Sequence, residues 1–490
     1  MRVLLWITLV ALSAAAATPP PVVSLTTGQI RGANLDQGGA VFKGIPFAQP
    51  PVGDLRWRPP APVKLWPGER DATTFGAPCA QNGALSKSSE DCLFLNVWNA
   101  EWPARSRKPV MLWLHGGGNY AGTASGNNFD GESLARHGVV LVTTNYRLTI
   151  FGFFAHPDLT RESSHHASGN YGLLDQIAAL QWIHDNITRF GGDPANVTIF
   201  GQSAGAVDAN VLMTSPLAKG LFQRVIAESG TVTRNPDAGT LSMTALGAVM
   251  DVKSGPVSYS DVAPLAEAEA KGQKLGTLKS LREMPAADLL KIVAAPQMSI
   301  GPANGVIVDG WAIPKPPAEV FAAGQEHRVP VLIGNNSRER TPPPVAPDDL
   351  RHAIEAMYGP LAPRAFELYG GDATQWVVDT MYRCPVIAQL LWHTAKNPAW
   401  EYEFDLARAT HGAEVPYVFG TAPDANIQTY WTNFAKTGNP NGPGSPEWPA
   451  FDPENRQYIE FTKDGPVAGD RLRRNFCNLY VENVNRLIGH

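Results

Sequence analysis

Several stretches of the chain are nearly continuous runs of apolar and β-branched residues, a pattern typical of strands buried on both faces. Residues 109–114 (PVMLWL), 139–144 (VVLVTT), 197–200 (VTIF) and 330–333 (PVLI) follow it. Strands of this kind belong to parallel sheets that carry helices on both sides. Residues 173–183, between the second and third runs, place apolar side chains at helical spacing. This order of strand and helix predicts an α/β fold with a large, mostly parallel central sheet.

The segments outside these runs predict how the sheet is extended and covered. Residues 22–60 alternate short apolar runs with Gly and Pro, as small antiparallel strands and their turns do. Residues 262–293 are rich in Ala, Leu, Glu and Lys and predict helices that cap the sheet. Residues 341–347 and 438–449 are predicted to be loops rich in Pro and Gly. No repeat, heptad or linker divides the chain, so we expect a single domain over residues 18–490.

The first 17 residues have the three-part layout of a secretory signal peptide. Arg2 precedes an apolar run at residues 3–12, and small residues at 13–17 provide a cleavage site. A membrane anchor is the alternative, but this run is too short for a hydrocarbon core that needs about 20 residues. No later segment is long and apolar enough either. We therefore expect a secreted or periplasmic protein without a membrane span.

The composition is that of a folded protein with no electrostatic preference for nucleic acid. Hydrophobic residues make up 44% of the 490 positions and include 13 Trp, enough for a large core. The 40 Lys and Arg against 45 Asp and Glu leave a net charge of −5. No basic run is long enough to bind nucleic acid, so such a partner is not expected. No heptad predicts a coiled coil, and we expect a monomer.

Four cysteines, Cys79, Cys92, Cys384 and Cys477, lie in the part expected to be exported. An even number in an oxidising compartment predicts two disulfides, for which three pairings are possible. Cys79 and Cys92 enclose only twelve residues, which favours their pairing with each other. A zinc site is the alternative, but the spacings match no common pattern of zinc ligands. No metal is expected.

Residues 201–205 (GQSAG) carry the strongest chemical signal. They follow the strand predicted at 197–200 and precede an apolar run suited to a helix. In that setting G-x-S-x-G predicts a nucleophile elbow, a turn so tight that the neighbours must be small, which lifts the hydroxyl of Ser203 clear of the sheet. A plain glycine-rich turn is the alternative, and the strand before it and the helix after it argue against that.

A second motif, HGGG at residues 115–118, ends the strand predicted at 109–114. Acyl transfer places negative charge on a carbonyl oxygen, and that charge needs preorganised N–H donors. Glycines let backbone N–H groups approach a substrate closely. Gly117, Gly118 and Ala204 are the candidate donors of such an oxyanion hole.

With these motifs the chain resembles the type-B carboxylesterase family, the group of para-nitrobenzyl esterases and cholinesterases. The resemblance extends over nearly the whole of residues 18–490. It rests on blocks that occur in order along the chain: GIPFA at 44–48, EDCLFLN at 90–96, NYR at 145–147, GNYGLLDQ at 169–176, FGGDP at 190–194, ESG at 228–230, HGAE at 411–414 and WTNFAKTG at 431–438. It implies an α/β-hydrolase fold in which helical excursions cap the sheet.

The resemblance also implies the rest of the site. In this fold the nucleophile, the acid and the histidine follow in that order, which matches Ser203, Glu339 in the segment GNNSRE, and His411 in HGAE. The further residues that it implies are Gln202, Ser229 and Glu414 around the triad, the disulfides Cys79–Cys92 and Cys384–Cys477, and a salt bridge between Arg56 and Glu90.

The chain departs from the family pattern at three places. Arg340 follows the acid, where the family usually has Gly; Asn119 stands where an aromatic residue is common; Gln202 stands where cholinesterase-like members have Glu. An anion beside the histidine would stabilise its imidazolium form, so the neutral Gln202 should extend activity towards acidic pH. The alternative is an amide that only forms local hydrogen bonds.

The resemblance implies a secreted serine carboxylesterase that hydrolyses short to medium acyl esters of small molecules through an acyl-enzyme, without a cofactor. A lipase or sterol esterase that acts on long acyl chains is one alternative. A non-catalytic adhesion protein is another, because the family includes members that have lost the serine. Ser203, Glu339 and His411 are all present in this chain, which argues against that alternative.

Overall fold

A computed structural model describes residues 18–82, 87–233, 262–294, 305–340, 346–406, 409–422 and 426–489. The predicted signal peptide, residues 1–17, lies outside these ranges, and so do residues 341–345 of a predicted loop. In the part of the chain that is described, no helix is both long enough and apolar enough to cross a membrane.

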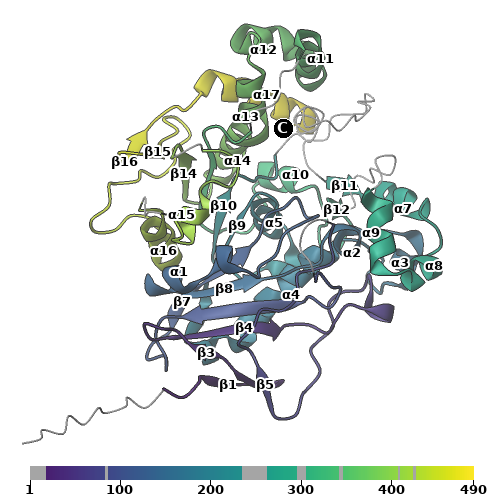
Figure 1. Cartoon of the computed structure of the whole chain (residues 1–490). Coiled ribbons are helices and arrows are strands. Elements are labelled where there is room, and N and C mark those ends of the chain that lie inside the picture. Colours follow the sequence, from purple (N-terminus) through teal and green to yellow (C-terminus); the bar gives the residue numbers. More distant parts are fainter. Residues whose placement is uncertain are drawn as a thin grey trace, which may run out of the picture.

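A sheet of eleven strands crosses the described part of the molecule and carries helices on both faces (Figure 1). Six successive pairs along its middle are parallel, and the pairs at its two ends are antiparallel. In spatial order the strands are β16 (Gly465–Gly469), β15 (Tyr458–Thr462), β14 (Ala399–Phe404), β13 (Val331–Asn336), β10 (Arg224–Glu228), β9 (Gly192–Gln202), β7 (Lys108–Leu114), β8 (Val140–Thr144), β6 (Phe94–Asn99), β4 (Ala40–Pro46) and β3 (Ala33–Asn34). The prediction of a large, mostly parallel sheet is confirmed.

Two small sheets accompany the large one in the described ranges. β1 (Val22–Leu25) pairs antiparallel with β2 (Gly28–Arg31), which also pairs with β5 (Glu69–Asp71). The antiparallel strands expected in residues 22–60 are therefore present. β11 (Val262–Pro264) pairs in parallel with β12 (Val306–Val308), a pair that local patterns did not predict.

The described ranges contain more helices than the sequence predicted, and one predicted loop residue lies in a helix. They are α1 (Glu132–Arg136), α2 (Thr149–Phe153), α3 (Pro157–Glu162), α4 (Tyr171–Asn186), α5 (Ala204–Leu212), α7 (Leu265–Gln273), α8 (Leu278–Glu283), α9 (Ala286–Ala294), α10 (Pro317–Ala322), α11 (Pro347–Tyr358), α12 (Ala362–Tyr369), α13 (Ala373–Val378), α14 (Cys384–His393), α15 (Val415–Val418), α16 (Ile427–Thr437) and α17 (Arg474–Ile488). The helical segment expected at 262–293 forms three short helices, α7 to α9. Pro347 was expected in a loop, but it begins α11, because proline suits the first turn of a helix.

Each central strand divides its side chains between two cores. On β7, Val110, Leu112 and Leu114 lie in the core that α4, α5 and α14 share, whereas Met111 and Trp113 lie in the core that α1 and α16 share. Successive side chains of a strand face opposite sides of a sheet. A strand covered on both sides must therefore be apolar throughout, which is why the continuous runs predicted these strands.

Both expected disulfides are present, between Cys79 and Cys92 and between Cys384 and Cys477. No cysteine is left free. The alternative of a zinc site is therefore wrong, because all four sulfur atoms are bonded to one another.

The expected salt bridge between Arg56 and Glu90 is also present, with a distance of 2.5 Å between Nη2 and Oε1. The other end of the Arg56 guanidinium donates to the backbone oxygens of Leu281, Arg282 and Met284 at the end of α8. One buried arginine thus connects the helical segment 262–294 to the N-terminal part of the fold.

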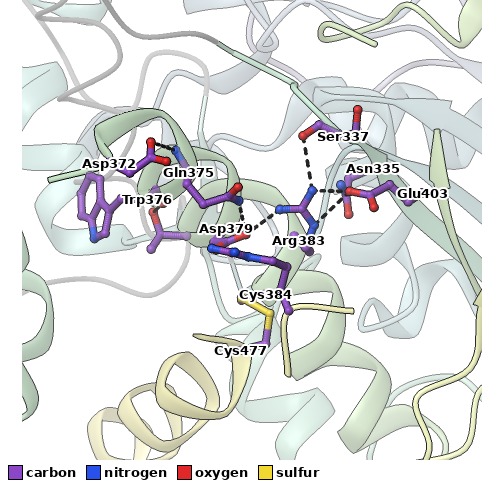
Figure 2. A network of polar contacts seen from close by, with 12 residues as sticks. Asn335, Ser337, Asp372, Gln375, Trp376, Asp379, Arg383, Cys384, Glu403 and Cys477 are labelled. Atoms are coloured by element: carbon purple, nitrogen blue, oxygen red, sulfur yellow. Dashed lines mark hydrogen bonds and ion pairs between the residues drawn. A yellow bond between two sulfur atoms is a disulfide. The ribbon is translucent and has the colours of Figure 1, made fainter. Parts of the chain in front are cut away.

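A π-helical turn, Asp379–Arg383, lies next to the second disulfide at the centre of a buried ionic network (Figure 2). Arg383 pairs with Asp379 at 2.5 Å and with Glu403 of β14. Its guanidinium also donates to the backbone oxygen of Ser337, just after β13. Arg473, at the start of α17, pairs with Asp379 at 2.9 Å. The network connects the C-terminal helix to the loop that follows β13.

We expect the second disulfide to contribute more to stability than the first. A bond that closes a longer loop removes more conformational entropy from the unfolded chain. The sequence separations are 93 and 13 residues, which correspond to about 4.6 and about 2.9 kcal/mol in the chain-entropy model. Urea unfolding of the double variant Cys384→Ser/Cys477→Ser should therefore show a larger loss in free energy than that of Cys79→Ser/Cys92→Ser. An equal or smaller loss would contradict this.

Candidate active site

Ser203 occupies the sharp turn between β9 and α5. Its backbone has φ 55° and ψ −120°, a conformation that L-residues rarely adopt. The turn needs glycine on both sides, since a Cβ on Gly201 would lie 2.6 Å from the backbone of Gly205, and one on Gly205 would lie 2.0 Å from the oxygen of Leu114. The N–H of Ser203 donates to the backbone oxygen of Glu228 on β10 at 2.8 Å. The geometry matches the nucleophile elbow predicted from GQSAG.

Three side chains from different elements form one continuous chain of hydrogen bonds. The Nε2 of His411 lies 2.8 Å from the Oγ of Ser203, and its Nδ1 lies 2.6 Å from an Oε2 of Glu339. Because the carboxylate can only accept, Nδ1 carries the proton and donates to Glu339. Nε2 is then the nitrogen that accepts from the Ser203 hydroxyl. The structure brings together three predicted residues whose spacings along the chain are 208 and 72 positions.

Main-chain contacts hold the acid against the histidine. The N–H of His411 donates to the backbone oxygen of Glu339 at 2.7 Å, and the Oε1 of Glu339 accepts from the N–H of Asn336 at 2.8 Å. Arg340, which replaces the family's glycine, directs its Nε to the hydroxyl of Tyr382 at 3.0 Å. The Tyr382 ring lies 5.2 Å from the His411 ring. The turn at the acid therefore forms with an arginine in the place of glycine.

The glycine loop, residues 115–118, contacts the elbow directly. A Cβ on Gly116 would lie 3.2 Å from the Cβ of Ser203. Gly117 and Gly118 have φ angles of 113° and 63°, which favour glycine. Ala204 is the first residue of α5, where N–H groups have no partner within the helix. The three candidate oxyanion donors thus belong to two backbone segments that touch beside Ser203.

Two buried side chains hold the segment of residues 115–122, which contains this loop. The Nε2 of Gln81, inside the first disulfide loop, donates to the backbone oxygen of Gly122 at 2.7 Å, and its Oε1 accepts from the N–H of Gly122 at 2.9 Å. The hydroxyl of Tyr146 donates to the backbone oxygen of His115 at 2.6 Å. Burial lowers the pKa of His115 to about 4, so this ring is neutral at pH 7. No sequence motif indicated that the disulfide loop contacts the segment after the glycine loop.

Gln202 lies beside the histidine, as expected. Its Nε2 is 3.3 Å from the Nε2 of His411, and the side chain is 8% exposed. It also packs on the glycine loop, since a Cβ on Gly116 would lie 2.7 Å from its Oε1. The neutral amide of Gln202 therefore lies where a carboxylate would face the base.

Two buried carboxyl groups, those of Glu414 and Glu228, lie close to the triad in the fold. The Oε2 of Glu414 accepts from the Nδ2 of Asn336 at 2.5 Å. Burial, with a smaller contribution from the charge of Glu339, raises the pKa of Glu414 to about 7. Glu228 accepts from the indole N–H of Trp431 at 2.8 Å, and burial raises the pKa of Glu228 well above its usual range. The uncharged form of Glu414 is therefore populated near neutral pH.

Ser229, the remaining predicted neighbour, directly follows β10. It is 2% exposed with φ 56°, and its N–H donates to the backbone oxygen of Gly334 at 2.9 Å. Its hydroxyl finds no hydrogen-bond partner among the described residues. Ser229 thus joins the end of β10 to β13 through its backbone rather than through its side chain.

Three residues that contact the site were missed at the sequence level: Asn336, Tyr382 and Asp208. Asn336 stands in the segment GNNSRE, which served only to locate the acid. Tyr382 gave no local signal, because it reaches His411 from the π-helical turn. Asp208 is the one charged residue within α5 (AGAVDANVL). A lone charge in an apolar helix was the signal that could have found it.

The chain is similar to known proteins over most of its length. The model of the carboxylesterase family matches residues 19–343 and 340–480. The chain belongs to the carboxylesterase family. It is 34% identical to the fumonisin B1 esterase of Sphingopyxis macrogoltabida, over 90% of this chain and 86% of the relative. It is 33% identical to the para-nitrobenzyl esterase of Bacillus subtilis, over 92% and 96%.

Solved structures agree with this membership. A PNB esterase superposes with a TM-score of 0.78 at 32% identity, and the match covers 94% of this chain and 100% of that one. The α/β-hydrolase fold implied by the sequence is confirmed, and this carboxylesterase family member is a carboxylic-ester hydrolase. Within the described ranges, no group of His, Cys, Asp and Glu is arranged to hold a metal ion.

Replacing Gln202 by Glu should move the acidic limb of kcat/KM to higher pH. A carboxylate beside His411 stabilises the imidazolium, and the base must be neutral to accept a proton. We expect a displacement of about one pH unit, because charges this close in a partly buried site interact by roughly 1–4 kcal/mol. Gln181→Glu adds the same charge at an exposed position of α4 and should leave the limb in place. An unmoved or downward-shifted limb in folded Gln202→Glu would contradict the prediction.

The raised pKa of Glu414 predicts a pH-dependent loss of stability. Between its ordinary pKa of 4.5 and the folded value of about 7, the folded state binds more protons than the unfolded state, so stability falls as pH rises through this range. Glu414→Gln can still accept from Asn336 but cannot ionise. Its free energy of unfolding relative to the parent should therefore increase by about 1–3 kcal/mol between about pH 5 and 8. Urea unfolding at several pH values, with exposed Glu319→Gln as control, measures this; a constant difference would refute it.

Proposed function

We propose that this chain is a serine carboxylesterase in which Ser203 is the nucleophile, His411 the general base and Glu339 the acid that orients it. The observation that carries the proposal is the unbroken chain of hydrogen bonds, 2.8 Å between Ser203 and His411 and 2.6 Å between His411 and Glu339. A serine hydroxyl is a weak nucleophile until a base takes its proton. The two distances support His411 as that base, with its proton on Nδ1.

In the first half-reaction, the Oγ of Ser203 attacks the carbonyl carbon of the ester while the Nε2 of His411 takes the hydroxyl proton. Glu339 stabilises the imidazolium through the Nδ1–H. When the tetrahedral intermediate collapses, the bond to the alcohol oxygen breaks and Nε2 returns the proton to that oxygen. The alcohol leaves, and the acyl group remains on Oγ.

The negative charge of the tetrahedral intermediate resides on the former carbonyl oxygen. The N–H groups of Gly117, Gly118 and Ala204 donate to it in this proposal. In the second half-reaction, water takes the place of the serine hydroxyl: His411 accepts its proton, the hydroxide attacks the acyl carbon, and Ser203 leaves with the proton. The net reaction converts ester and water into carboxylic acid and alcohol.

Short to medium acyl esters of small molecules are the proposed substrates. Relatives named para-nitrobenzyl esterase and liver carboxylesterase support small-molecule esters. The side chain of Asn119, at a position that is commonly aromatic in the family, is buried at 4% exposure and so adds no aromatic wall to the site. The stretch between Glu339 and His411 spans 72 positions. It is shorter than the resemblance to cholinesterases would imply, which favours an open pocket for bulky alcohol groups.

Export to the outside of the cell or to the periplasm is part of the proposal. The layout of residues 1–17 favours it. The two disulfides support it as well, because such bonds persist in oxidising compartments.

Turnover of para-nitrophenyl acetate by the purified protein tests the catalytic role of Ser203. Ser203→Ala should lower kcat by a factor on the order of 10⁴ to 10⁶, because the nucleophile is lost. Ser280→Ala, at an exposed position of α8, is the matched control and should retain full activity. Equal rates for the parent and Ser203→Ala would exclude the proposal and favour a non-catalytic homologue.

A series of para-nitrophenyl esters from acetate to palmitate tests the acyl preference. We expect kcat/KM to be highest for short and medium chains and to fall about tenfold or more for palmitate, since a pocket discriminates each misplaced methylene. A maximum at palmitate would instead indicate a lipase or sterol esterase.

A further inference from the structure

Asp208, a buried carboxyl group that the proposed mechanism does not use, links the glycine loop to α5. Its side chain is fully buried. The Oδ1 accepts from the Nδ2 of Asn119 at 3.0 Å, and the Oδ2 accepts from the Nε2 of Gln176 on α4 at 2.6 Å. Asn119 directly follows the glycine loop and is 4% exposed. One carboxyl group therefore joins the loop, α4 and α5.

The carboxyl group determines how the two amides are oriented. Both N–H₂ groups face Asp208, while the side-chain oxygens of Asn119 and Gln176 are buried and find no hydrogen-bond partner among the described residues. A buried oxygen without a hydrogen-bond partner destabilises the folded state. Hydrogen bonds to an ionised acceptor are roughly twice as strong as neutral ones, which offsets that cost. Burial raises the pKa of Asp208 to about 6, so the group is ionised in mildly alkaline solution.

The hydrogen bond between Asn119 and Asp208 connects the two backbone segments that carry the candidate oxyanion donors, the glycine loop and α5. Asn119 is the residue after Gly118, and Asp208 lies one helical turn after Ala204, on the same face of α5. The backbone of Asn119 is held as well, with φ 59° and its oxygen accepting from the N–H of Thr149 at 2.8 Å. This bond thus joins the backbone segment that carries the donors of the loop to the helix that carries the third donor.

We propose that Asn119 and Asp208 are positioning residues, which hold the N–H groups of Gly117 and Gly118 at the correct distance from that of Ala204. The inference rests on the proposed function, because these groups bind an oxyanion only during ester attack. A displaced donor binds the transition state less well and leaves ground-state binding almost unchanged. The pair therefore acts on kcat and not on KM.

Two variants at about pH 8 test this role. Asn119→Gly removes the side chain and still permits a positive φ, and Asp208→Ala removes the acceptor. Each should lower kcat by about 10- to 100-fold and change KM by less than about twofold, because a misplaced donor loses part of what a missing donor loses. The Ki of a trifluoromethyl ketone, whose adduct with the serine carries an oxyanion, should rise by the same factor.

The double variant separates the hydrogen bond from loop flexibility. If Asn119→Gly acts by breaking the bond to Asp208, it should have almost no further effect in the Asp208→Ala background. If it acts by loosening the loop, the two losses should multiply, which would overturn the proposal. Should Asp208→Ala fail to fold, Asp208→Val, which also lacks a hydrogen-bond acceptor, takes its place in the same cycle with the same expectation.

A control variant and the parent enzyme distinguish a failure of the positioning role from a failure of the proposed function. Asn186→Ala, on α4, removes a buried amide of the same kind, 5% exposed and with an unpartnered oxygen; it should reduce stability but leave kcat and Ki unchanged. Variants that keep the parent kcat, or that lose kcat with an unchanged Ki, overturn the positioning role. A parent enzyme no more active than Ser203→Ala overturns the proposed function instead.

Discussion

The backbone conformation of Ser203 is the constraint on which the rest of the site depends. A residue at φ 55° and ψ −120° stores strain of about 1–3 kcal/mol. It persists because β9 is paired on both sides, with β7 and β10. It also requires that Gly201, Gly205 and Gly230 lack a Cβ, which would lie within 2.7 Å of backbone atoms at each position. The serine oxygen is thereby fixed at the edge of the sheet, and every other group must be brought to it.

The acid and the histidine reach Ser203 because parallel strands end at the same edge of a sheet. Glu339 follows β13 by three residues, and His411 follows β14 by seven. A main-chain hydrogen bond of 2.7 Å joins the two loops. Arg383 also holds the loop after β13, because its guanidinium donates to the backbone oxygen of Ser337 (Figure 2). Backbone contacts thus bring Glu339 and His411 together, and their side chains then form the hydrogen bond between acid and base.

The buried carboxyl groups around the base and those of the C-terminal network have different hydrogen-bond partners. Asp379 and Glu403, in the C-terminal network, pair with Arg383. Glu414, Glu228 and Asp208 accept hydrogen bonds from amide or indole N–H groups instead. Neutral donors offset burial less than a guanidinium does, so the pKa values of these three groups are raised. Glu414 and Asp208, with pKa values of about 7 and about 6, can therefore change charge near neutral pH.

The sequence by itself determined the elements whose signal lies within a few residues. Continuous apolar runs predicted β7, β8, β9 and β13, and the GQSAG turn predicted the elbow, because steric limits on the backbone are local. The strand AWEYEF (β14) was not predicted, since Glu401 and Glu403 interrupt its apolar pattern; Glu403 is buried because Arg383, 20 residues earlier, reaches it. The pairing of the cysteines was open among three arrangements, and Glu339 and His411 were located only through a family resemblance. Only the tertiary structure decided these contacts, because residues far apart in the chain meet where the packed sheet and its helices bring them, and no local pattern encodes that meeting.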